Sequence, residues 1–273
     1  GYRFIHGTNM RITVEGSYDT PSAEFYDYSD EFTRNVLPFT LELGRAFVQP
    51  AYQPSNNLRK GMYSLDNLWD GLAAIAVEIP ETHYYFGKIT TYTTLPTEAR
   101  DMICYFYRKH FPDRDGLVWP HDPVPIQTDL NRLDTLFTGR NYKEDFQILQ
   151  RNVREMGHHV PALISAYMNL STSMRYFGTI FDADFGNTYE LGILVKVRDI
   201  HPEKHSRYFE TYDKRNRLFD RINLFRINPK RLPWWKTINE DEMAELSSLR
   251  DMKRRNKPFA SRRKTDTPNP EDA

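Results

Sequence analysis

The stretch Leu41-Glu42-Leu43-Gly44-Arg45-Ala46-Phe47-Val48 sets an acid, a glycine and a base at fixed spacing among β-favouring aliphatic and aromatic residues. It lies within 38–48, a segment that begins at one proline and is followed closely by another, so we expect a strand there. On a regular strand Glu42 and Arg45 would point to opposite faces. Because a glycine inside a strand often marks a β-bulge, we expect Gly44 to form one that turns both side chains to the same face.

Outward from this strand, segments with helical and with strand-like patterns alternate along the chain. The patterns predict helices over 65–77, 97–110, 142–156 and 161–170 and from Pro202, and strands over 2–14, 83–91, 174–180 and 189–197. In the second helix, Met102, Ile103, Phe106 and Tyr107 recur at the spacing of a buried face. Segment 113–139 contains several prolines and little periodicity, so we expect a long loop that covers the core. The fold class is therefore α/β.

Composition limits the classes of protein to which the chain could belong. Its 273 residues can bury one substantial core, and the 37 basic residues equal the 37 acidic ones, so no overall field favours nucleic acid as a partner. The single cysteine, Cys104, cannot form an internal disulfide, which fits a reducing compartment. No stretch approaches the roughly 20 apolar residues needed to cross a bilayer, and the start of the chain does not have the pattern of a secretion signal. We expect a cytoplasmic protein.

The C-terminal end differs in composition from the rest. Residues 250–264 are rich in Lys and Arg, and 265–273 contain prolines and acids. We expect one domain over 1–249 and a basic, disordered tail over 250–273. The first interpretation of the tail is a solvated linker. The second is attraction to anionic lipid, which would give peripheral contact with the inner face of the cytoplasmic membrane.

The quoted stretch resembles the Glu-x-x-Arg-x-Phe strand of two groups of enzymes. These are the acyl-homoserine-lactone synthases and the hemolysin-like acyltransferases that make ornithine and glycine lipids. The resemblance continues through 68–71, 85–87, 160–167 and 181–185, and so covers roughly residues 1 to 210. Residues 1–5 and 47–50 are most similar to the glycine-lipid N-acyltransferases of Bacteroidota. The resemblance implies a GNAT-like (acyl-CoA N-acyltransferase) fold with a mixed, mostly antiparallel sheet flanked by helices. In that family a segment with the first strands precedes the position where this chain begins, so we expect those strands to be missing here.

The resemblance also implies an activity, which is transfer of a (3-hydroxy)fatty acyl group from acyl carrier protein to the amine of an amino acid in aminolipid synthesis. Glycine is the preferred acceptor and ornithine the second choice. Such a reaction needs a base for the amine proton and donors for the tetrahedral oxyanion. We expect Glu42 to be the base and Arg45 to orient the base or the substrate carboxylate. Without the resemblance, a structural Glu–Arg pair on a partly exposed strand would be the simpler interpretation.

For the acyl donor, the resemblance places a slot for the pantetheine arm between the 41–48 strand and residues 85–89, with Phe47, Tyr85 and Gly87 beside it. Arg59, Lys60 and Gly61 lie in the loop that holds a diphosphate in coenzyme-A-dependent relatives. One glycine and two cations suit a single phosphate better. We therefore expect the phosphopantetheine thioester of acyl carrier protein as donor, with acyl-CoA as the alternative and no bound cofactor. Arg59 and Lys60 could equally be solvated loop charges.

On the acceptor side, Asp182 and Asp184 either line the amine pocket or pin a turn between strands. Arg175 and Arg45 are the candidates to bind the substrate carboxylate. We expect no metal site. Gly186 stands where a calcium loop would need a ligand, and the histidine pairs 158–159 and 201/205 lack further ligands at suitable spacing. Cys104 is expected to be a structural thiol.

Two alternatives of other kinds stay open. One is a coenzyme-A-dependent N-acetyltransferase that acts on another amine. The other is a membrane-binding, hemolysin-like protein without enzymatic activity. That protein would need export and a membrane-inserting element, and the sequence shows neither.

Overall fold

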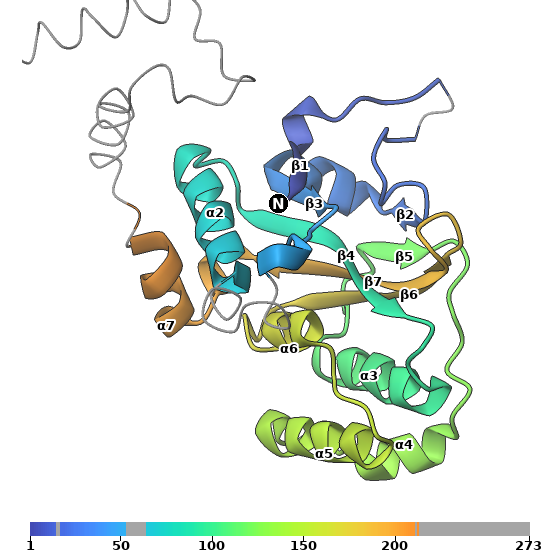
Figure 1. Cartoon of the computed structure of the whole chain (residues 1–273). Helices are drawn as coiled ribbons and strands as arrows, with labels where there is room; N and C mark the ends of the chain where they lie inside the picture. The colour runs from blue at the N-terminus through green and yellow to red at the C-terminus, as the bar shows by residue number, and fades with distance from the viewer. Residues whose placement is uncertain (15–16, 53–63, 211, 213–273) are drawn as a thin grey trace, which may run out of the picture. The chain divides into compact units, whose positions relative to one another are not determined.

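The computed structural model describes residues 1–14, 17–52, 64–210 and 212. Within these residues, five strands form one sheet in the order β1-β3-β4-β7-β6 (Figure 1). Their bounds are β1 Arg3–His6, β3 Thr40–Gly44, β4 Tyr84–Tyr92, β6 Arg175–Asp182 and β7 Thr188–Lys196. Only the β3–β4 pairing is parallel, and the other three are antiparallel. The predicted mixed, mostly antiparallel sheet of a GNAT-like fold is confirmed.

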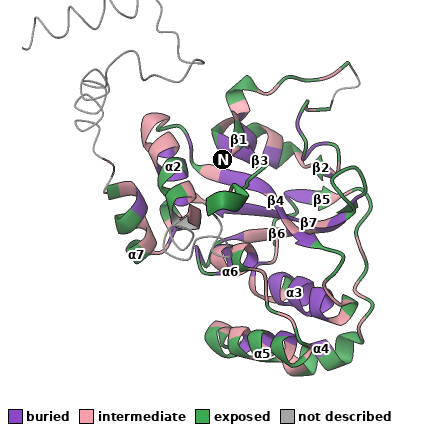
Figure 2. Cartoon of the chain, in the orientation of Figure 1, coloured by how far each residue is buried: buried purple, intermediate pink, exposed green. Residues whose placement is uncertain are grey.

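Helices cover one face of this sheet. The helices of the described residues are α2 Ser64–Glu78, α3 Thr97–His110, α4 Leu130–Leu136, α5 Tyr142–Glu155, α6 Ala162–Met168 and α7 Pro202–His205. Leu72 of α2 and Met102 of α3 pack in one buried cluster with Leu41 of β3 and Ile89 of β4. Figure 2 shows that α3 is largely buried, and in Figure 1 it lies between the sheet and α5. The four residues predicted to form its buried face are all at most 1% exposed.

Single helical turns complete the regular structure. The 3-10 turns are η1 Gly7–Asn9, η3 Leu37–Phe39, η4 Pro50–Tyr52 and η5 Val197–Asp199, and the π turns are η2 Phe32–Val36 and η6 Ser206–Glu210.

A second hydrophobic cluster lies on the opposite face of the sheet. The elements that cover this face are η2 and a two-stranded sheet of β2 (Tyr26–Tyr28) and β5 (Val118–Pro120). The Phe86 ring of β4 lies 5.5 Å from the Phe32 ring and 5.9 Å from the Phe177 ring, measured between centroids. Such edge-to-face aromatic pairs add to the free energy gained by burial of their area. The sheet is therefore buried on both faces, with helices on one side and an aromatic layer on the other.

Segment 113–139 and the end of the first strand differ from the sequence expectations. Segment 113–139, expected to be a loop, contains β5 and α4, although it does cover the core as expected. Asp129 caps α4 by accepting a hydrogen bond from the backbone N–H of Asn131 at 3.0 Å. The strand expected over 2–14 ends at His6. A side chain at Gly7 would meet the backbone of Leu37. The predicted boundary after residue 249 and the tail 250–273 lie outside the described residues.

Candidate active site

The two parallel strands part where β3 ends, about midway along β4. Pairing between β3 and β4 runs from Thr40 with Tyr84 to Leu43 with Gly87, after which β3 ends at Gly44 while β4 continues to Tyr92. A Cβ atom on Gly87 would lie 2.8 Å from the backbone oxygen of Leu43. Gly87 thus allows the strands to approach closely just before they separate.

Arg45, rather than Gly44, makes the turn out of β3. The register of β3 against β1 is unbroken from Leu41 to Gly44. Gly1 and Phe47 then exchange backbone hydrogen bonds one residue out of that register, so the irregularity predicted at Gly44 lies directly after it, at 45–46. Arg45 has φ 53°, in the left-handed region that is unfavourable for residues with a side chain. Its guanidinium carbon lies 4.8 Å from the centroid of the Phe185 ring, and the residue is exposed. The turn therefore takes Arg45 to the segment between β6 and β7.

Glu42 is buried on the face of the aromatic layer. Its neighbours Leu41 and Leu43 point to the helices, so Glu42 points the other way, and it is 4% exposed. Its Oε1 atom accepts a hydrogen bond from the backbone N–H of Ser22 at 3.1 Å, whereas Oε2 has no partner. Burial raises the pKa of Glu42, and the nearby side chains of Ser22 and Thr20, the backbone N–H of Ser22 and the charge of Lys88 oppose that rise. Glu42 is therefore a stronger base than an exposed carboxylate.

Lys88 lies on the same face, two residues beyond the register partner of Glu42. Its Nζ donates a hydrogen bond to the Pro21 carbonyl oxygen at 3.1 Å, lies 4.0 Å from the centroid of the Phe25 ring, and is 3.7 Å from Oδ2 of Asp182. Burial lowers the pKa of Lys88, and the carboxylates of Glu190, Asp182, Glu42 and Glu24 oppose this.

Lys88 and Glu190 were not predicted as site residues from the sequence. The one signal for them is the alternation of strand residues between two faces. Lys88 lies two residues after Phe86 and Glu190 two residues before Gly192, so each shares a face of its strand with a buried residue.

Asp182 has one of the two roles expected for it, that of pinning a turn, and it also contacts Lys88. Its Oδ1 atom accepts a hydrogen bond from the backbone N–H of Phe185 at 2.9 Å, which pins the turn after β6, while Oδ2 faces Lys88. Asp184 lies in the same turn and is exposed. Glu42, Lys88 and Asp182 thus form one polar group, which we call the Glu42 cluster, beside the place where β3 and β4 part.

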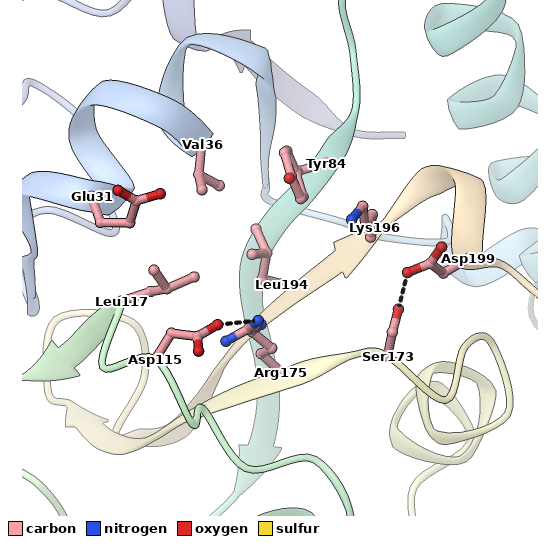
Figure 3. Close-up of a pocket in the computed structure, with 10 residues that line it drawn as sticks. All are labelled: Glu31, Val36, Tyr84, Asp115, Leu117, Ser173, Arg175, Leu194, Lys196 and Asp199. Atoms are coloured by element: carbon pink, nitrogen blue, oxygen red, sulfur yellow. Dashed lines mark hydrogen bonds and ion pairs between the residues drawn. The ribbon is translucent and has the colours of Figure 1, made fainter.

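Arg175 lies apart from this cluster. It begins β6 and Asp182 ends it, so the two are separated by roughly 20 Å along the strand. Nη1 of Arg175 donates a hydrogen bond to Oδ1 of Asp113 at 2.9 Å, and Nη2 forms an ion pair with Asp115. Arg175 lines a cavity of about 500 Å³ together with Tyr84 and Lys196 (Figure 3). The structure does not bring Arg175 together with Asp182 and Asp184.

The residues predicted for the donor side occupy different environments. The Tyr85 hydroxyl donates a hydrogen bond to the Leu72 carbonyl oxygen of α2 at 2.9 Å, so its polar end is used within the core. Phe47 is exposed, and its backbone oxygen accepts a hydrogen bond from the amino group of Gly1 at 2.7 Å. Arg59, Lys60 and Gly61 lie outside the described residues.

Other reactive groups occupy plainly structural positions. Cys104 is buried, its Sγ lies 3.3 Å from Oγ1 of Thr179, and burial raises the pKa of the thiol.

Among the residues that the structure describes, no three His, Cys, Asp or Glu side chains gather to hold a metal ion. In the same part of the chain, no helix is both long and apolar enough to cross a membrane.

Comparison with known proteins gives two relatives. No family model matches the chain, and no solved structure does either. The chain is 42% identical over 212 residues to a protein of Bacteroides thetaiotaomicron named glycine N(alpha)-acyltransferase, a match that covers 78% of this chain and 63% of that protein. It is also 42% identical over 216 residues to a protein of the same name from Phocaeicola vulgatus, covering 79% and 66%. The matches thus cover less than two thirds of each relative, and the predicted resemblance to glycine N-acyltransferases of Bacteroidota is confirmed.

Proposed function

We propose that this protein is an amino acid N-acyltransferase that moves an acyl group onto the amine of glycine. The names of the two relatives support the reaction class and the acceptor. The observation in the structure that carries the proposal is Glu42, a buried carboxylate with one unpartnered oxygen, next to the place where the parallel strands part. A base and an opening for an extended donor are what acyl transfer to an amine requires.

Glu42 acts on the acceptor amine in this proposal. A neutral amine nitrogen attacks the thioester carbonyl, so a C–N bond forms and the C–S bond breaks. The amine loses its proton to Glu42, directly or through a water molecule, and the departing thiolate takes up a proton. The raised pKa of Glu42 suits this role, because a base with a higher proton affinity removes the amine proton more readily. Arg45 is exposed at the turn out of β3, with its guanidinium over the Phe185 ring, and would meet an anionic group of a substrate that enters beside this turn.

The proposed donor is a (3-hydroxy)fatty acyl group on the phosphopantetheine arm of acyl carrier protein. The arm would enter where β3 and β4 separate, beside Gly87, and its phosphate would meet Arg59, Lys60 and Gly61. The support is the family resemblance of these residues and the parting of the strands. The product would be an aminolipid. Its acyl chain would bring the cytoplasmic enzyme into peripheral contact with the membrane.

The test is mass spectrometry of lipids from cells that express the full-length protein and are fed isotope-labelled glycine. We expect an N-acylated glycine that carries the label, and its mass gives the length and hydroxylation of the acyl chain. In vitro, purified protein with glycine should use acyl carrier protein thioesters better than acetyl-CoA. Label in an acetylated amine instead, with no acylated glycine, would contradict the proposal and favour a coenzyme-A-dependent acetyltransferase.

A further inference from the structure

An amino acid acceptor presents a carboxylate as well as an amine, and a buried site for it needs a cation. The two terminal guanidinium nitrogens of Arg175 already form ion pairs, Nη1 with Asp113 and Nη2 with Asp115. Arg175 also lies at the far end of β6 from the Glu42 cluster. Arg45 is exposed, and its guanidinium is stacked on Phe185. Neither arginine lies in the buried site where the base is.

Lys88 has the position and the spare hydrogen-bonding capacity that the two arginines lack. Its ammonium has three N–H donors, and one of them is used by the Pro21 carbonyl oxygen. Its ion pair with Asp182 is 3.7 Å long, beyond a normal hydrogen bond. The side chain is 14% exposed, so a bound carboxylate would interact with Lys88 in a poorly screened environment.

Glu42 supplies the complementary group. A buried carboxylate oxygen without a partner carries a free-energy cost that a bound N–H donor would remove. An amine next to Glu42 and a carboxylate next to Lys88 would together match the two ends of one small amino acid. The Phe25 ring lies against Lys88 and the backbone N–H of Ser22 against Glu42, so segment 22–25 contacts both residues on the face of the sheet that carries them.

We propose that Lys88 binds the carboxylate of the amino acid acceptor while Glu42 meets its amine. This inference rests on the proposed function and makes Lys88 a specificity-determining residue for it. Glycinamide serves as the comparison acceptor, because it has the amine and nearly the size of glycine but an uncharged amide in place of the carboxylate. Comparison of these two acceptors isolates the interaction between Lys88 and the carboxylate.

The experiment measures kcat/KM for glycine and for glycinamide with one acyl donor at one pH, in the wild-type protein and in Lys88→Met. The wild type should prefer glycine, and Lys88→Met should lower the glycine-to-glycinamide ratio by about 10- to 100-fold, the range of one charge-assisted hydrogen bond. A change in the proton affinity of Glu42 would affect both acceptors alike and so cancels in the ratio.

Lys196→Met is the matched control, because Lys196 is a partly buried lysine that faces the cavity beside Arg175. Its ratio should equal that of the wild type. Lys88→Arg keeps the charge in case Lys88→Met does not fold, and should raise KM for glycine with little change for glycinamide. The inference would be overturned if both Lys88 variants kept the wild-type ratio of kcat/KM for glycine to that for glycinamide. It would also be overturned if the preference for glycine were lost in Lys196→Met or Arg175→Met instead. Failure of the wild type to acylate either acceptor would count against the proposed function itself.

Discussion

The backbone N–H of Ser22 donates a hydrogen bond to one carboxylate oxygen of Glu42 at 3.1 Å, and the other oxygen of Glu42 has no partner. The segment before β3 therefore fixes the carboxylate without satisfying it. A carboxylate held this way is costly to the folded state and suited to binding a donor group. Stability and activity should consequently respond in opposite directions when Glu42 is changed.

Glu42→Gln should raise the melting temperature at pH 8 and have little effect near pH 4. The pKa of Glu42 is raised in the folded protein, so the folded state binds the proton more tightly than the unfolded state does. The free energy of unfolding of the wild type therefore falls as the pH rises above the usual carboxyl range. Glutamine carries no charge at any pH and avoids that loss. Melting curves at both pH values check this, with exposed Glu31→Gln as control. A wild type at least as stable as Glu42→Gln at pH 8 would show that the charge is well solvated.

Gly87→Ala should destabilise the protein and reduce acyl transfer, because the added methyl would lie 2.8 Å from the Leu43 carbonyl oxygen and push β3 away from β4. We expect a loss of about 1–3 kcal/mol in the free energy of unfolding. The control is Gly71→Ala in α2, where nothing lies within 4 Å of the new Cβ, and which should stabilise slightly. Urea titration measures both. Equal effects of the two substitutions would mean that the close approach of the strands is unimportant.

Asp101→Ala should cost about 3–5 kcal/mol of stability, the usual loss when one partner of a buried ion pair is removed. Asp101 is 1% exposed, forms an ion pair with Arg100, and accepts hydrogen bonds from the backbone N–H groups of Gln127 and Thr128 at 2.8 Å. It thus ties α3 to the loop before α4. Arg34→Ala breaks an exposed ion pair with Asp30 and should change stability by less than about 1 kcal/mol. A loss for Asp101→Ala as small as that for Arg34→Ala, in urea denaturation, would refute the role given to Asp101.

Elements with a strong periodic pattern could be predicted from the sequence. Helix α3 was predicted with its correct bounds, because Met102, Ile103 and Phe106 recur at helical spacing and Pro96 precedes it. Strands β2 and β5 have three residues each, too few to show alternation. They exist because they pair with each other over the sheet. Helix α4 has seven residues and follows several prolines, so its pattern was not distinctive.

The candidate site could be predicted only in part. Glu42 and Asp182 belong to stretches that resemble a family, and both lie in the Glu42 cluster. Nothing in the sequence marks Lys88, a lysine within a strand-like segment, as buried. Its burial depends on Pro21 and Phe25, far away in the sequence. A bulge was expected at Gly44 because a glycine inside a strand often marks one, yet the residue with positive φ is Arg45.

Charge reversal of both Arg59 and Lys60 tests the proposed donor. If these residues meet the phosphate of an acyl carrier protein, the double variant should have a higher KM for the donor and an unchanged melting temperature, and salt should weaken donor binding in the wild type. Steady-state kinetics at two ionic strengths with acyl carrier protein thioester as the varied substrate measures this. Unchanged donor kinetics would identify both as solvated charges.

The central claim is that Glu42 takes the proton of the acceptor amine, and the kcat of Glu42→Gln for glycine as a function of pH tests it most directly. Glutamine keeps the shape of the side chain and removes the base. We predict that kcat falls about 100-fold or more near neutral pH, with partial recovery as the pH rises and more of the amine is already neutral. Circular dichroism of the full-length variant serves as the folding control. A folded Glu42→Gln protein with near-normal kcat across the pH range would contradict the account and make Glu42 a structural residue of β3.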